Sequence, residues 1–163
     1  MNSAQEAFVE ITTALDYPML IVTAQADDGP AGCLVGFSTQ CSVHPPRYLV
    51  CLSEKNRTQR VATQTDVLAV HFLEAGEMEL ARLFGEETTD ETDTFSRCQW
   101  HPGPSEVPIL SGCGRWFVGQ ILERRALGDH VGFLLEPIEA HSQGPRRGLF
   151  FQQLKDLDPG HEP

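Results

Sequence analysis

The chain lacks the features of several large protein classes. No apolar run approaches the roughly 18 residues of a membrane-spanning helix, and the N-terminus, MNSAQEAFVEI, has no basic start followed by an apolar stretch. Basic residues are scarce, because 12 Lys and Arg stand against 23 Asp and Glu, for a net charge of -11. This balance disfavours an anionic membrane surface or a large nucleic-acid footprint. We therefore expect a cytoplasmic protein with a small-molecule partner, no membrane and no nucleic acid.

Cysteine is also sparse and shows no metal-binding spacing. The five cysteines are odd in number, scattered and never spaced as CxxC. We expect them to be reduced and mostly buried. The nearest pair of metal-ligand types is Cys98 and His101 in CQWH, with no second pair at finger-like spacing. The sequence therefore predicts no metal site.

Three catalytic or nucleotide-binding motifs are missing as well. There is no GxGxxG that opens a helix after a strand, and no GxxxxGK[ST] loop. No GxSxG occurs, and Ser38 in GFSTQ lacks the flanking glycines of a nucleophile elbow. A Rossmann dinucleotide site, a P-loop and a Ser-His-Asp hydrolase are thus not supported.

Three segments are predicted to form short helices. The range 3–15 places apolar residues at helical spacing, with Ser3 as the candidate N-cap. A second helix begins near Asn56, a residue type that caps helices well. A third covers 77–85 and ends at Gly85.

The remaining regular segments are predicted to be strands of a single domain, residues 1–163. They are mostly adjacent in sequence, and the two longest form an antiparallel pair joined through Gly128 and Asp129. Glycines at 112, 114 and 119 are placed for the bends of a small barrel. This pattern predicts a mainly β fold, a barrel with a few short helices, with strands in the ranges 19–26, 31–44, 47–53, 67–74, 109–127 and 130–142.

Two segments are predicted to be less regular. The acidic run GEETTDETD, residues 85–93, is typical of a solvated loop. The tail from Gln143 is rich in Gly, Pro and charge, and GLFFQQL is its one structured candidate.

A locally basic turn stands out in this acidic chain. Arg47, Lys55, Arg57 and Arg60 lie close together in sequence with only Glu54 against them. The stretch SEKNRT combines hydroxyls, an amide and cations at a predicted strand-to-helix junction, which is the donor set that captures a phosphate. Anion binding is one interpretation of this turn, and a solvated loop with a few arginines is the other.

An ordered set of short motifs resembles the flavin reductase-like family, whose domain is an FMN-binding split β-barrel that usually forms homodimers. The marks cover roughly residues 15–150, which would be the core of the domain. They are YP with LIVTA (Tyr17–Ala24), CSVHPP (Cys41–Pro46), LVCLS, NRT, LARLF (Leu80–Phe84), VPILSG (Val107–Gly112) and GDH (128–130).

The resemblance implies a set of cofactor-binding positions. The segment before the double proline would lie along the isoalloxazine ring, and the turn after the next strand would hold the ribityl phosphate. Phe84 matches an aromatic residue of the family, and His130 matches the histidine near the flavin and the nicotinamide, although it could equally satisfy the turn after Asp129. The implied binding residues are Val35, Gly36, Phe37, Ser38, Ser42, Ser53, Lys55, Asn56, Arg57, Thr58 and Phe84, with His130 as the catalytic candidate.

The chain departs from the family pattern at several of these positions. The family has a Thr, an Asn and a Ser-Phe pair where this chain has Leu34, Gly36, Phe37 and Ser38, so two side-chain donors are missing and the Ser-Phe order is inverted. Leu135 stands where a Gly commonly follows the GDH strand. Backbone contacts with a flavin ring could survive these changes.

The resemblance implies an NAD(P)H-dependent reductase of FMN or FAD, working as a homodimer and able to supply reduced flavin to a monooxygenase. The flavin carries the chemistry, so the protein need only hold the ring and form a slot for the nicotinamide. Two alternatives stay open: an FMN-binding electron carrier or sensor without efficient NAD(P)H oxidation, and a structural or haem-associated barrel without flavin.

Overall fold

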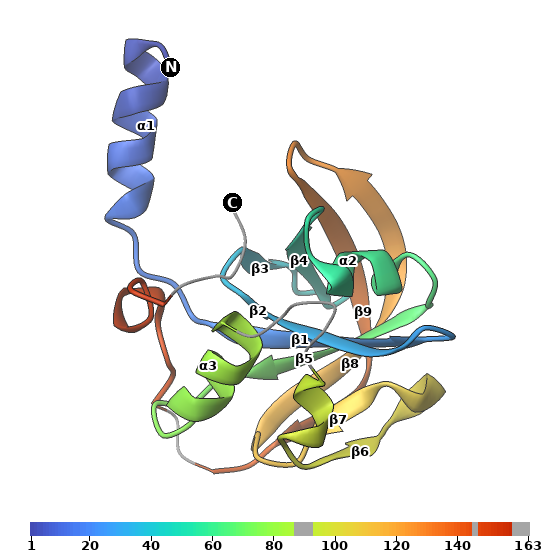
Figure 1. The fold of residues 1–163 in the computed structure, drawn as a ribbon. Helices are drawn as coiled ribbons and strands as arrows, with labels where there is room; N and C mark the ends of the chain where they lie inside the picture. The colour runs from blue at the N-terminus through green and yellow to red at the C-terminus, as the bar shows by residue number, and fades with distance from the viewer. Residues whose placement is uncertain (87–92, 145–146, 158–163) are drawn as a thin grey trace.

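The fold is built on one antiparallel sheet of seven strands, in the order β2-β1-β5-β8-β9-β4-β3. The computed structural model describes residues 1–86, 93–144 and 147–157. A separate two-stranded sheet pairs β6 with β7 (Figure 1). The strands are β1 Leu20–Ala26, β2 Gly29–Val35, β3 Ser38–Ser42, β4 Arg47–Ser53, β5 Val67–Phe72, β6 Trp100–Pro102, β7 Pro108–Leu110, β8 Arg115–Ala126 and β9 His130–Ser142.

Strand β1, next to the edge strand β2, is buried on both faces, which explains its nearly continuous apolar sequence. Leu20 and Val22 face the main core between the strands and α2. Met19 and Ile21 face a second cluster, beneath α3 and the C-terminal segment. Because side chains alternate along a strand, one short run of apolar residues serves two cores.

The first helix, α1 (Ser3–Thr13), is present but does not pack against the domain. It extends away from the sheet (Figure 1), and none of its residues is buried. Its N-cap is Asn2, whose side chain accepts from the Gln5 backbone N–H, so the prediction of Ser3 as the cap was wrong. The apolar residues that predicted a packed amphipathic helix, including Phe8 and Ile11, are exposed.

The other two helices lie close to their predicted places. Helix α2 spans Arg57–Ala62 with Asn56 as its N-cap, as predicted. Helix α3 spans Met78–Glu86, and it continues one residue past Gly85. The predicted acidic loop falls largely on residues 87–92, outside the described residues. No helix in the described part of the chain is long and apolar enough to cross a membrane.

Strands β8 and β9 form the predicted long hairpin through Gly128, whose φ of +124° suits glycine. The run from residue 109 is not one strand, however. It divides into β7 and β8, with a turn over residues 111–114 between them. A Cβ at Gly114 would approach the Gln143 carbonyl oxygen to 2.3 Å, so the segments before β8 and after β9 come together there in a way that needs glycine. The β6–β7 hairpin was not predicted.

The C-terminal segment is fastened to the start of β1. Isolated bridges join Pro18 with Phe150 and Glu74 with Gly148. The Phe151 backbone N–H donates to the Tyr17 carbonyl at 2.9 Å. The predicted structured stretch GLFFQQL thus forms bridges and a short 3-10 helix, Phe151–Gln153, that run alongside the sheet.

Candidate functional site

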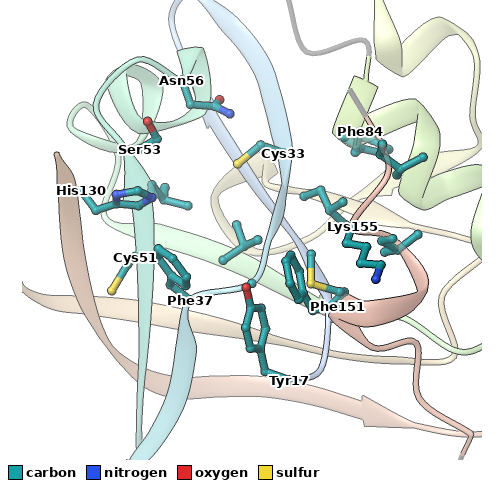
Figure 2. A pocket seen from close by; sticks show the side chains of 18 residues that line it. Tyr17, Cys33, Phe37, Cys51, Ser53, Asn56, Phe84, His130, Phe151 and Lys155 are labelled. Atoms are coloured by element: carbon teal, nitrogen blue, oxygen red, sulfur yellow. The ribbon is translucent and has the colours of Figure 1, made fainter. Parts of the chain in front are cut away.

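A cavity of about 580 Å³ opens where the ends of β2 and β4 meet α3 and the C-terminal segment. Its lining is mostly apolar and aromatic, with polar side chains at separate places (Figure 2). This size and composition are typical of a site for a cofactor-sized ligand. Seven of the twelve residues predicted from the sequence line it: Val35, Gly36, Phe37, Ser53, Asn56, Phe84 and His130.

The end of β2 supplies a wall with little room for side chains. A Cβ on Gly36 would lie 2.5 Å from the Tyr17 ring and 3.3 Å from the Met19 sulfur. The next residue, Phe37, is half exposed, and its ring lies between those of Tyr17 and His130, with centroid distances of 6.2 and 5.1 Å. Glycine at position 36 therefore lets the Tyr17 ring pack directly against the backbone at the end of β2.

The turn between β4 and α2 supplies the polar end of the cavity. The Ser53 hydroxyl accepts from the Lys55 backbone N–H at 3.3 Å. The Asn56 side chain caps α2 by accepting from the Thr58 backbone N–H at 2.9 Å. The turn is held against the β8–β9 hairpin by a bond from the Glu54 N–H to the Asp129 carbonyl. Ser53 and Asn56 can still offer a hydroxyl and amide hydrogens to a ligand.

Five predicted residues do not line the cavity. The Arg57 guanidinium donates to the carbonyls of Pro30 and Asp28 and ties α2 to the β1–β2 hairpin. The other four are Ser38, whose hydroxyl bonds the Tyr48 hydroxyl at 2.9 Å, Thr58, which is buried, Ser42 at the far end of β3, and Lys55, which lies on the turn itself.

His130 stands at the start of β9, at the mouth of the cavity. Its Nδ1 lies 2.7 Å from the Asp129 carboxylate. Hydrogen bonding from His130 lowers the pKa of Asp129 below its ordinary value, and Lys55 contributes in the same direction through its charge. The Asp129 carboxylate thus fixes the ring of His130, which leaves Nε2 as the atom that can meet a ligand.

A second aromatic wall was missed by the residue-level prediction. Tyr17 and Phe151 stack at 4.7 Å between centroids and an angle of 17°, and both line the cavity. Phe84 closes the cavity from α3, fully buried against Phe95. Leu154 and Lys155 complete the C-terminal side. The YP motif and the stretch GLFFQQL marked these segments, but nothing local in the sequence indicated that they meet.

Thiols in the lining are kept protonated. Burial raises the pKa of Cys33 to about 12, against a smaller opposing effect from its hydrogen bond with Thr58. Burial also raises the pKa of Cys51. All five cysteines are free, and no group of three potential metal ligands occurs within residues 1–86, 93–144 and 147–157. The site therefore offers no thiolate nucleophile and no metal centre among the described residues.

Known proteins share this fold and sequence pattern. Residues 12–155 match the flavin reductase like domain. An FMN reductase (NADH), RutF, of Cronobacter turicensis is 38% identical, over 90% of this chain and 88% of that protein. The reductase component of a 4-hydroxyphenylacetate 3-monooxygenase of Escherichia coli is 28% identical, over 79% of this chain and 76% of that protein.

A solved structure supports the same fold and family. An NADH:FAD oxidoreductase of Streptomyces globisporus superposes with a TM-score of 0.81 at 25% identity, covering 92% of this chain and 90% of that one. With the seven-stranded antiparallel sheet, this match confirms the predicted mainly β split barrel with a few short helices. The chain belongs to the flavin reductase like domain family.

Proposed function

We propose that this protein is an oxidoreductase that uses NADH or NADPH to reduce FMN or FAD held in the cavity. The observation that carries the proposal is the combination of an aromatic-walled slot, where Gly36 lets the Tyr17 ring pack against the backbone, with a polar turn at Ser53 and Asn56. The relatives named FMN reductase (NADH) and NADH:FAD oxidoreductase support the same activity.

The residues present suit a flavin. Val35, Gly36 and Phe37 would lie along the isoalloxazine ring, through backbone contacts that do not need the side-chain donors missing from this chain. Ser53 and Asn56 would meet the ribityl phosphate, with Lys55 supplying positive charge from the same turn. Arg57 would act indirectly, because its guanidinium anchors α2 to the β1–β2 hairpin.

When bound, the flavin supplies the redox chemistry, accepting a hydride from the nicotinamide at N5. The protein holds the ring, excludes water and orients the donor. Phe37 and His130 stand side by side at the mouth of the cavity and would line the slot for the nicotinamide, with Asp129 fixing the imidazole ring. No group in this scheme has to transfer a proton.

The decisive experiment is anaerobic mixing of the flavin-loaded protein with NADH and, separately, with NADPH. We expect loss of the visible absorbance of the oxidised flavin with at least one donor. The second candidate, an electron carrier or sensor, is favoured by the missing donors at Leu34 and Gly36. That candidate requires bound flavin that neither nucleotide bleaches, and this result would reject the reductase.

Lys55→Ala is expected to weaken FMN binding by about tenfold and riboflavin binding by less than twofold, because only FMN carries the phosphate. The measurement is calorimetric titration with both ligands. Arg60→Ala, which removes the same charge from the end of α2, is the matched control. Equal losses of affinity for FMN and riboflavin would show that the phosphate does not bind at this turn.

The single domain, residues 1–163, is also proposed to form a homodimer. Support comes from exposed apolar side chains, including Leu122 and Ile138 on the sheet and Val43 in the turn after β3. Analytical ultracentrifugation is expected to give twice the chain mass, and Ile138→Glu is expected to shift the protein toward monomer. A monomer at micromolar concentration would contradict the proposal.

We also propose a partner that uses the reduced flavin, and a location for the protein in the cell. The relative that is a monooxygenase reductase component supports a flavin-dependent monooxygenase as the consumer of the reduced flavin. Five free thiols support a reducing compartment, and we propose the cytoplasm.

A further inference from the structure

Lys155 has a distinctive place in the cavity. Among the described residues that line the cavity, it is the one with a permanent charge. Within the described residues, no carboxylate lies within ion-pair distance of its amine. Its neighbour Asp156 lines a different hollow, with Arg82 and Glu86. Lys155 is exposed, so its charge lies at the rim of this mostly apolar cavity. In a chain of net charge -11, a cation at that place is available to an anionic group of a ligand.

The backbone around Lys155 is fixed, so its position is built into the fold. The Gln152 backbone N–H donates to the Asp16 carboxylate, and its side-chain amide donates to the carbonyls of Thr13 and Leu15. Leu154, immediately before the lysine, is 5% exposed and belongs to the second core. Lys155 is therefore carried to the cavity by contacts that span most of the sequence.

The charge stands apart from the polar turn. Figure 2 shows Lys155 on the opposite side of the cavity from Ser53, Asn56 and His130, with the rings of Tyr17 and Phe151 on the intervening wall. A flavin phosphate at the turn would thus lie across the cavity from Lys155. The anion that Lys155 meets must belong to a second ligand, or to a second part of a larger one.

We propose that Lys155 binds the pyrophosphate of the nicotinamide dinucleotide and so positions the electron donor. The inference rests on the proposed reductase function and names the residue that recognises its donor. A single ammonium matches a compact anionic group that NADH and NADPH share. Its contribution belongs to donor binding, because Lys155 lies across the cavity from the turn proposed to hold the flavin phosphate.

The test compares donors with and without phosphates. Lys155→Ala is expected to raise KM about tenfold for NADH and NADPH, with kcat within about twofold, because a charge-assisted contact made equally before and during hydride transfer is lost. Dihydronicotinamide riboside, which carries no phosphate, should reduce the flavin equally well with wild type and variant. Lys155→Arg should retain most of the NADH affinity.

Arg82→Ala is the matched control, because Arg82 carries the same charge and lies beside the C-terminal segment but outside this cavity. It should leave every KM near the wild-type value. Thermal melting of each variant checks that the fold is kept. Titration of the flavin-loaded protein with NADH should give the same tenfold loss in affinity for Lys155→Ala.

Three results would overturn the assignment. An equal loss with the riboside would mean that Lys155 acts through the structure, and a loss confined to NADPH would place it at the 2′-phosphate. A larger loss of FMN than of riboflavin would make it a flavin-phosphate residue. Failure of the wild type to react with any donor would instead reject the reductase, and the NADH titration would still test Lys155.

Discussion

Gly36→Val is expected to lower the affinity for FMN by about 100-fold, or nearly 3 kcal/mol, with the fold retained. A Cβ at this position would stand 2.5 Å from the Tyr17 ring, closer than real side chains approach. The added side chain must therefore displace the Tyr17 ring, which stacks on Phe151, or shift the backbone at the end of β2. Either response removes the flat wall along which the flavin is proposed to lie, and calorimetric titration with FMN measures the loss.

Gly76→Val is the control for the glycine substitution, because a Cβ there meets nothing within 4 Å. It should bind FMN as the wild type does. Circular dichroism and thermal melting of both variants show whether a loss of FMN affinity comes from the altered cavity or from unfolding of the protein. Wild-type affinity in a folded Gly36→Val protein would mean that the flavin does not lie along this wall.

The strands were predictable because their signals are local. The short apolar runs of β1, β4 and β5, with their β-branched residues, identify them, and the turn at Gly128 pairs β8 with β9. Asn56 was recognised as a helix cap for the same reason, since its bond to the Thr58 N–H spans two residues. The adjacency of the strands and the glycines at 112, 114 and 119 predicted a barrel, and the family resemblance identified it as a split barrel.

Parts of the site that depend on distant contacts were not predictable. Phe151 reaches the cavity through a backbone bond to Tyr17, which is 134 residues away in the sequence. Arg57 looked like a phosphate ligand from its place in a basic turn, yet its guanidinium bonds carbonyls of the β1–β2 hairpin. Local sequence reveals which residues can bind an anion, whereas the packing of the chain decides which of them reach the ligand.

The buried His71 is expected to make the protein lose about 3 kcal/mol of stability between pH 6.5 and pH 4. Its Nδ1–H donates to the Ile21 carbonyl at 3.1 Å, and its Nε2 accepts from the Leu110 N–H at 3.0 Å. The neutral ring thereby joins β5 to β1 and β7. Burial lowers its pKa to about 4, with a smaller contribution from the charge of His101.

The direction of the pH effect follows from the two pKa values of His71. Below pH 6.5 His71 becomes protonated in the unfolded chain, whereas in the folded protein it stays neutral until about pH 4. Acid therefore favours unfolding across this interval. Urea unfolding at pH 7 and pH 4.5 measures the change. Carboxylates also titrate here, so the informative quantity is the difference in slope between wild type and His71→Gln, whose amide can still donate and accept.

His71→Gln should be less stable at pH 7, but its stability should fall less steeply toward pH 4.5. Parallel curves for the two proteins would show that the pKa of His71 does not differ between the folded and the unfolded protein.

The acid effect also bears on the cavity, because Ile21 and Leu110 belong to the same core as Phe84 and Leu154. Protonation of His71 would loosen the layer that supports α3 and the C-terminal wall, so bound flavin is expected to be released at a pH above that of global unfolding.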